Sequence, residues 1–119
     1  MSTSRQSENP MIIVIGILDL RHCDLDAAGA VAAEHMASVA AQPGCAHCSI
    51  AVDCTDPHRL HLTERWDTPE AFLANGKSPR QKAFSDMIGE LGITIVDLRA
   101  WAADEWIGLL QSAPKDSTR

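Results

Sequence analysis

Residues 45–67 read CAHCSIAVDCTDPHRLHLTERWD, and this stretch decides the fold of the chain. Its first ten residues place apolar side chains at the even positions and small or polar ones at the odd positions, and its last nine residues alternate in a similar way. A period of two is typical of half-buried strands, and the sequence Thr55–His58 between them is typical of a turn. We therefore predict a β-hairpin that has Leu62, Glu64 and Trp66 on one face of its second strand.

Patterns typical of further strands and helices lie on both sides of this hairpin. The predicted elements, in chain order, are a strand over residues 11–20, an amphipathic helix from about 25 to 42, strands over 45–54 and 59–67, two short helices that are separated at 75–77 and end near 91, a strand over 93–101, and a further helical turn or two within 102–110. The order β-α-β-β-α-β predicts an α+β domain of the ferredoxin-like type, with helices on one face of a four-stranded antiparallel sheet.

The other face of this predicted sheet has no cover within the chain. Soluble monomers rarely expose so large an apolar surface. We therefore predict a homodimer in which two sheets pack face to face.

The composition excludes several classes of protein. The chain has 119 residues, enough for one domain, and its 10 Lys and Arg against 16 Asp and Glu give a net charge of −6. Nucleic acids and anionic membranes need clustered positive charge, so neither is an expected partner. No apolar run approaches the ~20 residues that span a bilayer. We expect a cytoplasmic protein with a disordered leader at 1–10, one domain at 11–103 and a C-terminal extension at 104–119.

The four cysteines, at positions 23, 45, 48 and 54, indicate reduced thiols. Nothing in the sequence indicates export, so disulfides are not expected. Cys45 and Cys48 form a C-x-x-C motif without a second ligand pair at zinc-finger spacing, and residues three apart in a strand point to opposite faces. His47 shares a face with Cys45, but two ligands do not make a zinc site. We therefore expect no bound metal.

Three short motifs follow one another along the chain. Gln42–Cys45 fits the pattern E/Q-P-G-C, residues 64–72 fit E-x-W-x-S/T-x-E-A-hydrophobic, and residues 78–84 fit the helix start S/T-P-H-x-x-A-F except at its His. Their order and spacing resemble those of the antibiotic-biosynthesis monooxygenase family, over about Met11–Trp101. The resemblance implies the same fold and a dimeric barrel.

The resemblance also implies a cofactor-independent monooxygenase, in which a small aromatic or quinol-like substrate reacts with dioxygen without metal, haem or flavin. Such a protein supplies an apolar pocket between sheet and helices, a base or acceptor for the phenol, and a donor for the developing oxyanion. Haem-degrading relatives carry an iron-binding His ten residues after a Trp, and residues 75–85 contain neither. A non-catalytic ligand-binding dimer and an isomerase or cyclase on the same barrel are the alternatives.

Matching positions indicate the candidate pocket residues. Trp66 stands where the family has a pocket-side tryptophan, so it lines the pocket or else belongs to the core. Leu62 and Phe72, in place of an Asn and a Tyr of the polyketide oxygenases, are expected to line a pocket that is more apolar than usual. Asn75 and Arg80 replace two His of quinol-type members and flank the expected pocket mouth. Arg80 is a candidate to stabilise an enolate or phenolate, or else a solvated arginine at a helix start.

Other polar residues have both a functional and a structural interpretation. His35 lies on the apolar stripe of the first helix and is our candidate general base, or else a core histidine. Glu64 is a substrate-binding carboxylate with a raised pKa, or else the partner of an arginine such as Arg99. His47 and His61 are expected as cross-strand neighbours on the other face of the sheet.

Overall fold

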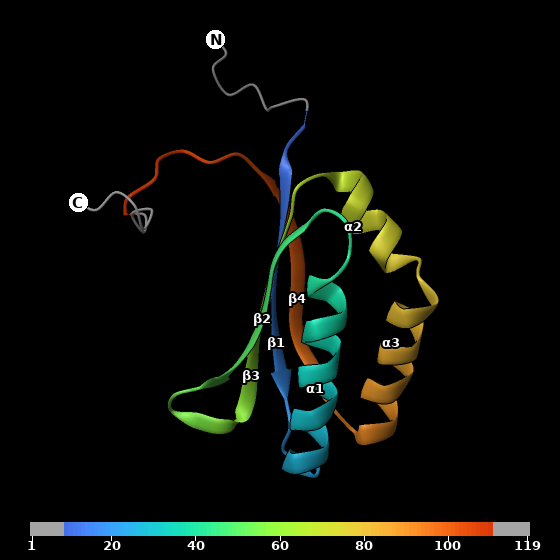
Figure 1. The fold of residues 1–119 in the computed structure, drawn as a ribbon. Helices are drawn as coiled ribbons and strands as arrows, with labels where there is room; N and C mark the ends of the chain where they lie inside the picture. The colour runs from blue at the N-terminus through green and yellow to red at the C-terminus, as the bar shows by residue number, and fades with distance from the viewer. Residues whose placement is uncertain (1–8, 111–119) are drawn as a thin grey trace, which may run out of the picture.

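The chain folds into one four-stranded sheet with its helices on a single face (Figure 1). The structure, a computed structural model, describes residues 9–110. Its elements are β1 (Met11–Asp19), α1 (Leu25–Ala40), β2 (Cys45–Asp53), β3 (Asp56–Trp66), α2 (Pro69–Gly76), α3 (Pro79–Leu91) and β4 (Thr94–Ala103). The strand order is β2-β3-β1-β4, and each neighbouring pair is antiparallel. The predicted α+β ferredoxin-like fold is confirmed, whereas residues 1–8 of the predicted leader and 111–119 of the predicted extension lie outside the described residues.

Side-chain caps determine where the helices begin. Thr68 Oγ1 accepts the backbone N–H of Ala71 at 3.1 Å, and Ser78 Oγ accepts that of Gln81 at 3.1 Å. Asp24 caps α1 in the same way. Such caps satisfy N–H groups that have no partner inside the helix, and each is worth about 1 kcal/mol. They hold the starts of α2 and α3, which carry part of the site described below.

Gly44 lets α2 pack closely against the start of β2. Its φ is +82°, in the region that favours glycine, and a Cβ atom there would lie 2.5 Å from the Cβ of Ala71. The Gly44 carbonyl also accepts the backbone N–H of Asp67 at 2.8 Å, just after β3. Any larger residue would strain the backbone and push α2 away from the sheet.

The core under the helices consists of two apolar clusters along the strands. One contains Ile12, Val14, Val39 and Trp66, and the other contains Leu18, Leu20, Ala28 and Leu60. Between them the sheet row reads Ile50, Leu62, Gly16 and Leu98 from edge to edge. Gly16 contributes no side chain to this row, and the two clusters are therefore separated at this level.

The start of β2 differs from the predicted alternation. Cys45 pairs with Trp66 and His47 pairs with Arg65, so Ala46 is an extra residue in a β-bulge. The bulge puts Cys45 and Cys48 on the same face, both packed against the first core cluster. The prediction that these two thiols point to opposite faces was therefore wrong.

Three smaller predictions were also wrong. The hairpin turn is the dipeptide Cys54–Thr55, because β3 already begins at Asp56. His47 lies opposite Arg65 and His61 lies opposite Ala51, so the two histidines are not cross-strand neighbours. The last strand extends to Ala103, and residues 104–110 form no helix.

Among the residues that the structure describes, no helix is long and apolar enough to span a membrane.

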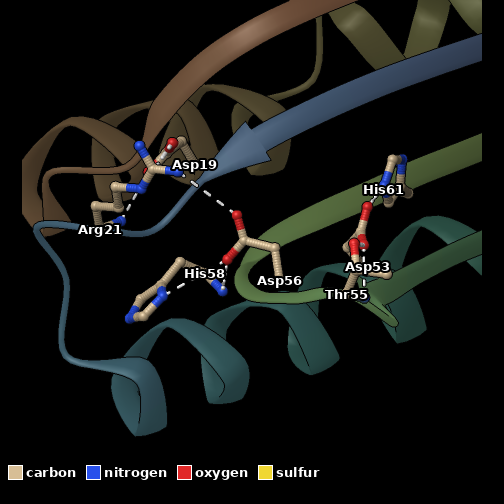
Figure 2. A network of polar contacts seen from close by, with 7 residues as sticks. All are labelled: Asp19, Arg21, Asp53, Thr55, Asp56, His58 and His61. Atoms are coloured by element: carbon tan, nitrogen blue, oxygen red, sulfur yellow. Dashed lines mark hydrogen bonds and ion pairs between the residues drawn. The ribbon is translucent and has the colours of Figure 1, made fainter.

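A polar network surrounds the turn of the hairpin (Figure 2). Asp53 accepts the backbone N–H and the hydroxyl of Thr55 at 2.8 and 2.7 Å, and His61 Nε2 lies 2.8 Å from its other oxygen. These bonds, that of His61 first, hold the pKa of Asp53 well below its usual range. Arg21 contacts Asp56 at 3.5 Å and joins the end of β1 to the hairpin. The network accounts for these charged residues as structural elements of the turn.

Candidate functional site

A cavity of about 340 Å³ lies between the sheet and the helices, at the level where the two core clusters are separated. Leu62, Leu98 and Ile50 from the Gly16 row all line it. A Cβ atom at Gly16 would lie 2.9 Å from Leu98 Cδ1, so the missing side chain is one reason for the space. The other lining residues include Val14, Leu18, His35, Glu64, Phe72, Asn75, Gln81, Phe84 and Ile88. The walls are mainly apolar, with a few polar residues from α1, α2, α3 and β3, and Arg99 of β4 is also among the lining residues.

Glu64 is the buried carboxylate of this cavity. Its residue is 6% exposed, and its Oε1 accepts the indole N–H of Trp66 at 2.8 Å. Burial raises the pKa of Glu64, and the bond from Trp66 opposes that rise in part. The partner seen in the structure is thus an indole rather than an arginine. One oxygen is fixed by the indole, so the other is available to a bound molecule.

Trp66 itself lies one layer behind the cavity. It is 0% exposed and is not among the lining residues, but its indole holds Glu64 and its ring contacts Phe72 edge-on at 6.5 Å between centroids. The structure therefore gives Trp66 a core position from which it orients a lining carboxylate and supports a lining aromatic ring.

His35, on α1, forms part of the helix-side wall of the cavity. Its ring stacks on that of Phe84, with centroids 3.5 Å apart and planes 8° apart. Burial, and next the charge of Arg80, lower the pKa of His35 to about 4, so the imidazole is neutral at neutral pH. The same two rings also line a second hollow of about 280 Å³ on the outer side, between α1 and α3. The stacked pair is therefore the partition between the inner cavity and this hollow.

Asn75 and Arg80 lie next to each other at the junction of α2 and α3. Arg80 Nη2 donates a hydrogen bond to Asn75 Oδ1, and Asn75 Nδ2 lies 3.4 Å from Gln81 Oε1. Asn75 lines the inner cavity, whereas Arg80 lines the hollow between α1 and α3. Both residues also line a further outer hollow, beside Gly44 and Ala71. Arg80 thus acts on the cavity through Asn75 and through its field on His35, and not by direct contact.

Five of the predicted site residues line the same cavity, and the other two, Trp66 and Arg80, are not among its lining residues. The lining ones are His35, Leu62, Glu64, Phe72 and Asn75. Sequence reasoning missed Phe84 and Gln81 as wall residues. Phe84 had a signal in the apolar stripe of the second short helix, but Gln81 had none, because its role depends on how α3 meets α2.

The thiols near the site are protonated. Burial, and next the charge of Glu64, raise the pKa of Cys48 to about 12. All four cysteines are free. Within residues 9–110, no group of three or more His, Cys, Asp or Glu side chains is placed to hold a metal ion.

Known proteins resemble this chain in sequence pattern and in fold. The family model described as antibiotic biosynthesis monooxygenase matches residues 11–87. A protein from Deinococcus radiodurans assigned to this family is 20% identical, with a TM-score of 0.76 over 84% of this chain and 99% of that one. SnoaB, a cofactor-independent oxygenase from Streptomyces nogalater solved in a mutant form, is 15% identical, with a TM-score of 0.72 over 82% of this chain and 97% of that one. No curated protein sequence matches the chain.

Proposed function

The chain belongs to the antibiotic biosynthesis monooxygenase family, and we propose that it is a cofactor-independent monooxygenase for a small electron-rich aromatic compound. The substrate would be a hydroquinone or an anthrone-like ring system held between sheet and helices. A cavity of about 340 Å³ with mainly apolar walls suits a ligand of that class. The relation to SnoaB, named as a cofactor-independent oxygenase, supports the same reaction type.

The observation that carries the proposal is the buried carboxylate of Glu64. A general base works best when its pKa lies near the working pH, and burial moves Glu64 in that direction. His35, with a pKa of about 4, is poorly matched to this role. We therefore assign proton abstraction to Glu64 and hydrogen bonding to the substrate to neutral His35.

The reaction balances without an external reductant. Glu64 takes a proton from the activated carbon or hydroxyl, and the resulting anion transfers an electron to dioxygen. The two radicals combine, the distal oxygen takes back the proton from Glu64, and water leaves with loss of the second hydrogen. The methylene group of an anthrone, or a ring C–H carbon of a hydroquinone, thus becomes a carbonyl; one oxygen atom enters the product, and the other becomes water.

Asn75 is the proposed donor to the developing oxyanion. Its side-chain oxygen is engaged by Arg80, and its Nδ2 makes one contact, with Gln81, so one N–H remains for a ligand. The guanidinium of Arg80 polarises this amide and adds positive charge near the site. Such oriented donors are worth about 10²–10³ in rate in other enzymes.

The proposed active form is a homodimer. The face of the sheet opposite the helices exposes Ile15 at 49% and Trp101 at 52%. Two such faces packed together would bury these side chains, as aligned sheet packing does in sandwiches. The proposed assembly leaves the cavity on the helix side of each chain.

Oxygen uptake with a panel of hydroquinones and anthrones tests the proposed reaction. The expected result is uptake above the autoxidation rate, with one ¹⁸O atom from ¹⁸O₂ in the product. Glu64→Gln should lower kcat by roughly 10²–10⁴-fold with little change in KM, whereas Glu90→Gln, at an exposed position on α3, should match wild type.

Three results would count against this proposal. Ligand binding without oxygen uptake would make the chain a binding protein, and turnover without oxygen would make it an isomerase or cyclase. Full activity in Glu64→Gln would remove this carboxylate from the reaction.

A further inference from the structure

The inner cavity is closed on one side by two aromatic rings. Among the described residues, only His35 and Phe84 line both this cavity and the hollow of about 280 Å³ between α1 and α3. The two helices run side by side over the sheet (Figure 1), and the two rings stack with their centroids 3.5 Å apart. A single layer of side chains therefore separates the two spaces.

The hollow behind the rings has room for part of a ligand. Its other walls come from both helices and include the apolar side chains of Val31, Ala83 and Met87. Phe84 is half-buried, and its ring lies between this hollow and the inner cavity. Removal of the Phe84 ring would therefore join the two spaces into one longer pocket.

The cavity is open on another side, along the edge strand β4. Ile95 and Leu98, here called the β4 lip, line the cavity and are 47% and 50% exposed. Leu18 and Leu62, which line it from the inner strands, are buried. The cavity therefore reaches solvent at the β4 lip, whereas at α1 and α3 it ends on the stacked rings.

Aromatic contacts are concentrated at this cavity. Both phenylalanines of the chain, Phe72 on α2 and Phe84 on α3, line it. Flat aromatic ligands gain energy from offset or edge-on contact with such rings. Phe84 therefore stands where it would contact an aromatic ligand and also limit its extent.

The stack keeps the ring of Phe84 in this position. His35 is buried, so its imidazole cannot move aside without displacing its neighbours. Rotation of Phe84 into the outer hollow would break the ring contact with His35. The partition is thus held from the α1 side and not by Phe84 alone.

We propose that Phe84 is a specificity-determining residue that makes the cavity one-sided. This inference rests on the aromatic substrate proposed above and narrows its class. The ring system carries its substituents on the side that faces the β4 lip, and none on the side that faces α1 and α3. A substituent at the lip extends into solvent, whereas one at the partition overlaps with Phe84. Such an overlap excludes a ligand more sharply than the loss of a contact does.

Binding of a matched ligand panel compares the two sides of the cavity. The probes are a naphthol and its phenyl derivatives, with the phenyl group at each free ring position in turn. Calorimetry on the full chain gives their dissociation constants. The wild-type chain should bind the parent and some isomers about equally, and the other isomers at least about tenfold more weakly. Equal binding of the whole panel, or rejection of every isomer, would overturn the proposal.

Truncation of the partition tests the role of Phe84. Phe84→Ala should improve the affinity for the rejected isomers, relative to the parent, at least about tenfold. Phe84→Leu, which retains more of the apolar contact, should give a smaller improvement. The matched control is Met87→Ala on the same helix, because Met87 lines the outer hollow and not the inner cavity. Wild-type selectivity in both Phe84 variants would mean that another wall sets the limit.

A variant at the β4 lip leaves the buried rings unchanged. Ile95→Trp places a larger side chain at the opening of the cavity. It should weaken binding of the isomers that the wild-type chain accepts at least about tenfold, and leave the affinity for the parent nearly unchanged. If the accepted isomers bind Ile95→Trp as they bind wild type, their substituents do not pass the lip and the proposal is wrong.

The pKa of His35 gives a readout that needs no ligand. Burial, and next the charge of Arg80, lower it to about 4. Phe84→Ala should raise it toward 6.5, because water from the outer hollow then reaches the imidazole. The charged groups that line the two spaces near His35 stay in place in this variant: Glu34, Glu64 and Arg80. A proton NMR titration, with His35→Phe to identify the signal, measures the change. A pKa that stays near 4 would show that the ring does not separate the two spaces.

Oxygen uptake on the same samples judges the proposed reaction separately. The expected selectivity without oxygen uptake would retain the role of Phe84 and remove the reaction. Oxygen uptake without the expected selectivity would remove the role of Phe84 and retain the reaction. If the wild-type chain binds neither the naphthol nor any of its derivatives, the aromatic pocket itself is wrong and both proposals fail.

Discussion

The two faces of the sheet are built from the same four strands and differ in what covers them. On the helix face, Trp66 is fully buried and donates its indole N–H to Glu64. On the open face, Trp101 is half exposed and its row neighbours are Ile13, Arg65 and His47. One face contains a cavity with buried polar groups, and the other exposes Ile15 and Trp101 beside charged side chains of both signs.

The polar groups on the two faces differ in their surroundings. Buried polar groups such as Glu64 and His35 have shifted pKa values because the helices exclude water from them. Polar groups on the open face, such as His61 with Asp53, form surface networks instead. We therefore propose chemistry for the covered face and assembly for the open one.

The largest expected effect compares the two tryptophans. Trp66→Ala should lower the free energy of unfolding by about 3–5 kcal/mol, because it leaves a cavity and removes the donor to a buried carboxylate. Trp101→Ala should leave the stability of the monomer nearly unchanged and weaken the dimer. Urea unfolding at a concentration below the dimer dissociation constant provides the comparison. Equal losses of stability in the two variants would contradict the distinction between the faces.

Much of the covered face could be predicted from strand periodicity. The alternation in β3 is unbroken, so it predicts Leu62, Glu64 and Trp66 on one face, and the three side chains do share it. The same reasoning failed in β2, because nothing in the residues around Ala46 marks the bulge that moves Cys45 to the helix face.

The cavity was harder to predict than the strands around it. Gly16 leaves space in the cavity because it has no side chain. This effect depends on the register that brings Leu62 and Leu98 beside it. Arg80 was expected at the pocket mouth, but it contacts Asn75 and faces the outer hollows. Such positions depend on helix placement across the sheet, which periodicity within one helix does not give.

The second prediction concerns pH and the covered face. His35 has a pKa of about 4 in the folded chain and near 6.5 when unfolded. Between these values the unfolded chain binds more protons, so stability rises with pH across this window and levels off above it. The shift in the pKa of His35 corresponds to an increase in the free energy of unfolding on the order of 3 kcal/mol across this window.

Replacement of His35 tests this pH dependence. His35→Phe keeps a ring against Phe84 and removes the titration, so its stability should lack the rise between about pH 4 and 6.5. Urea unfolding at several pH values measures it, and His22→Phe, at an exposed position, is the control. A rise of the same size in both variants would show that other groups cause it.

The third prediction concerns the space at Gly16. Gly16→Val should push Leu98 into the cavity, lower the free energy of unfolding by about 1–3 kcal/mol and reduce the affinity for aromatic ligands. Gly29→Ala on α1 has open space around its Cβ and should stabilise the chain slightly. Unchanged ligand affinity in Gly16→Val would mean that the ligand binds away from this row.

The smallest expected effect concerns the charge on Glu64. Its pKa is raised in the folded chain, so the folded state binds more protons, and stability falls as pH rises from the unfolded value through the folded one. Glu64→Gln keeps an oxygen for the indole of Trp66 and removes the buried charge. It should be more stable than wild type at pH 8 by up to about 1 kcal/mol, because the loss of a charge-assisted hydrogen bond offsets part of the gain. This advantage should shrink as the pH falls, because the wild-type carboxyl then gains a proton as well. A variant that loses both stability at pH 8 and oxygen uptake would show that the charged form is held by partners other than Trp66.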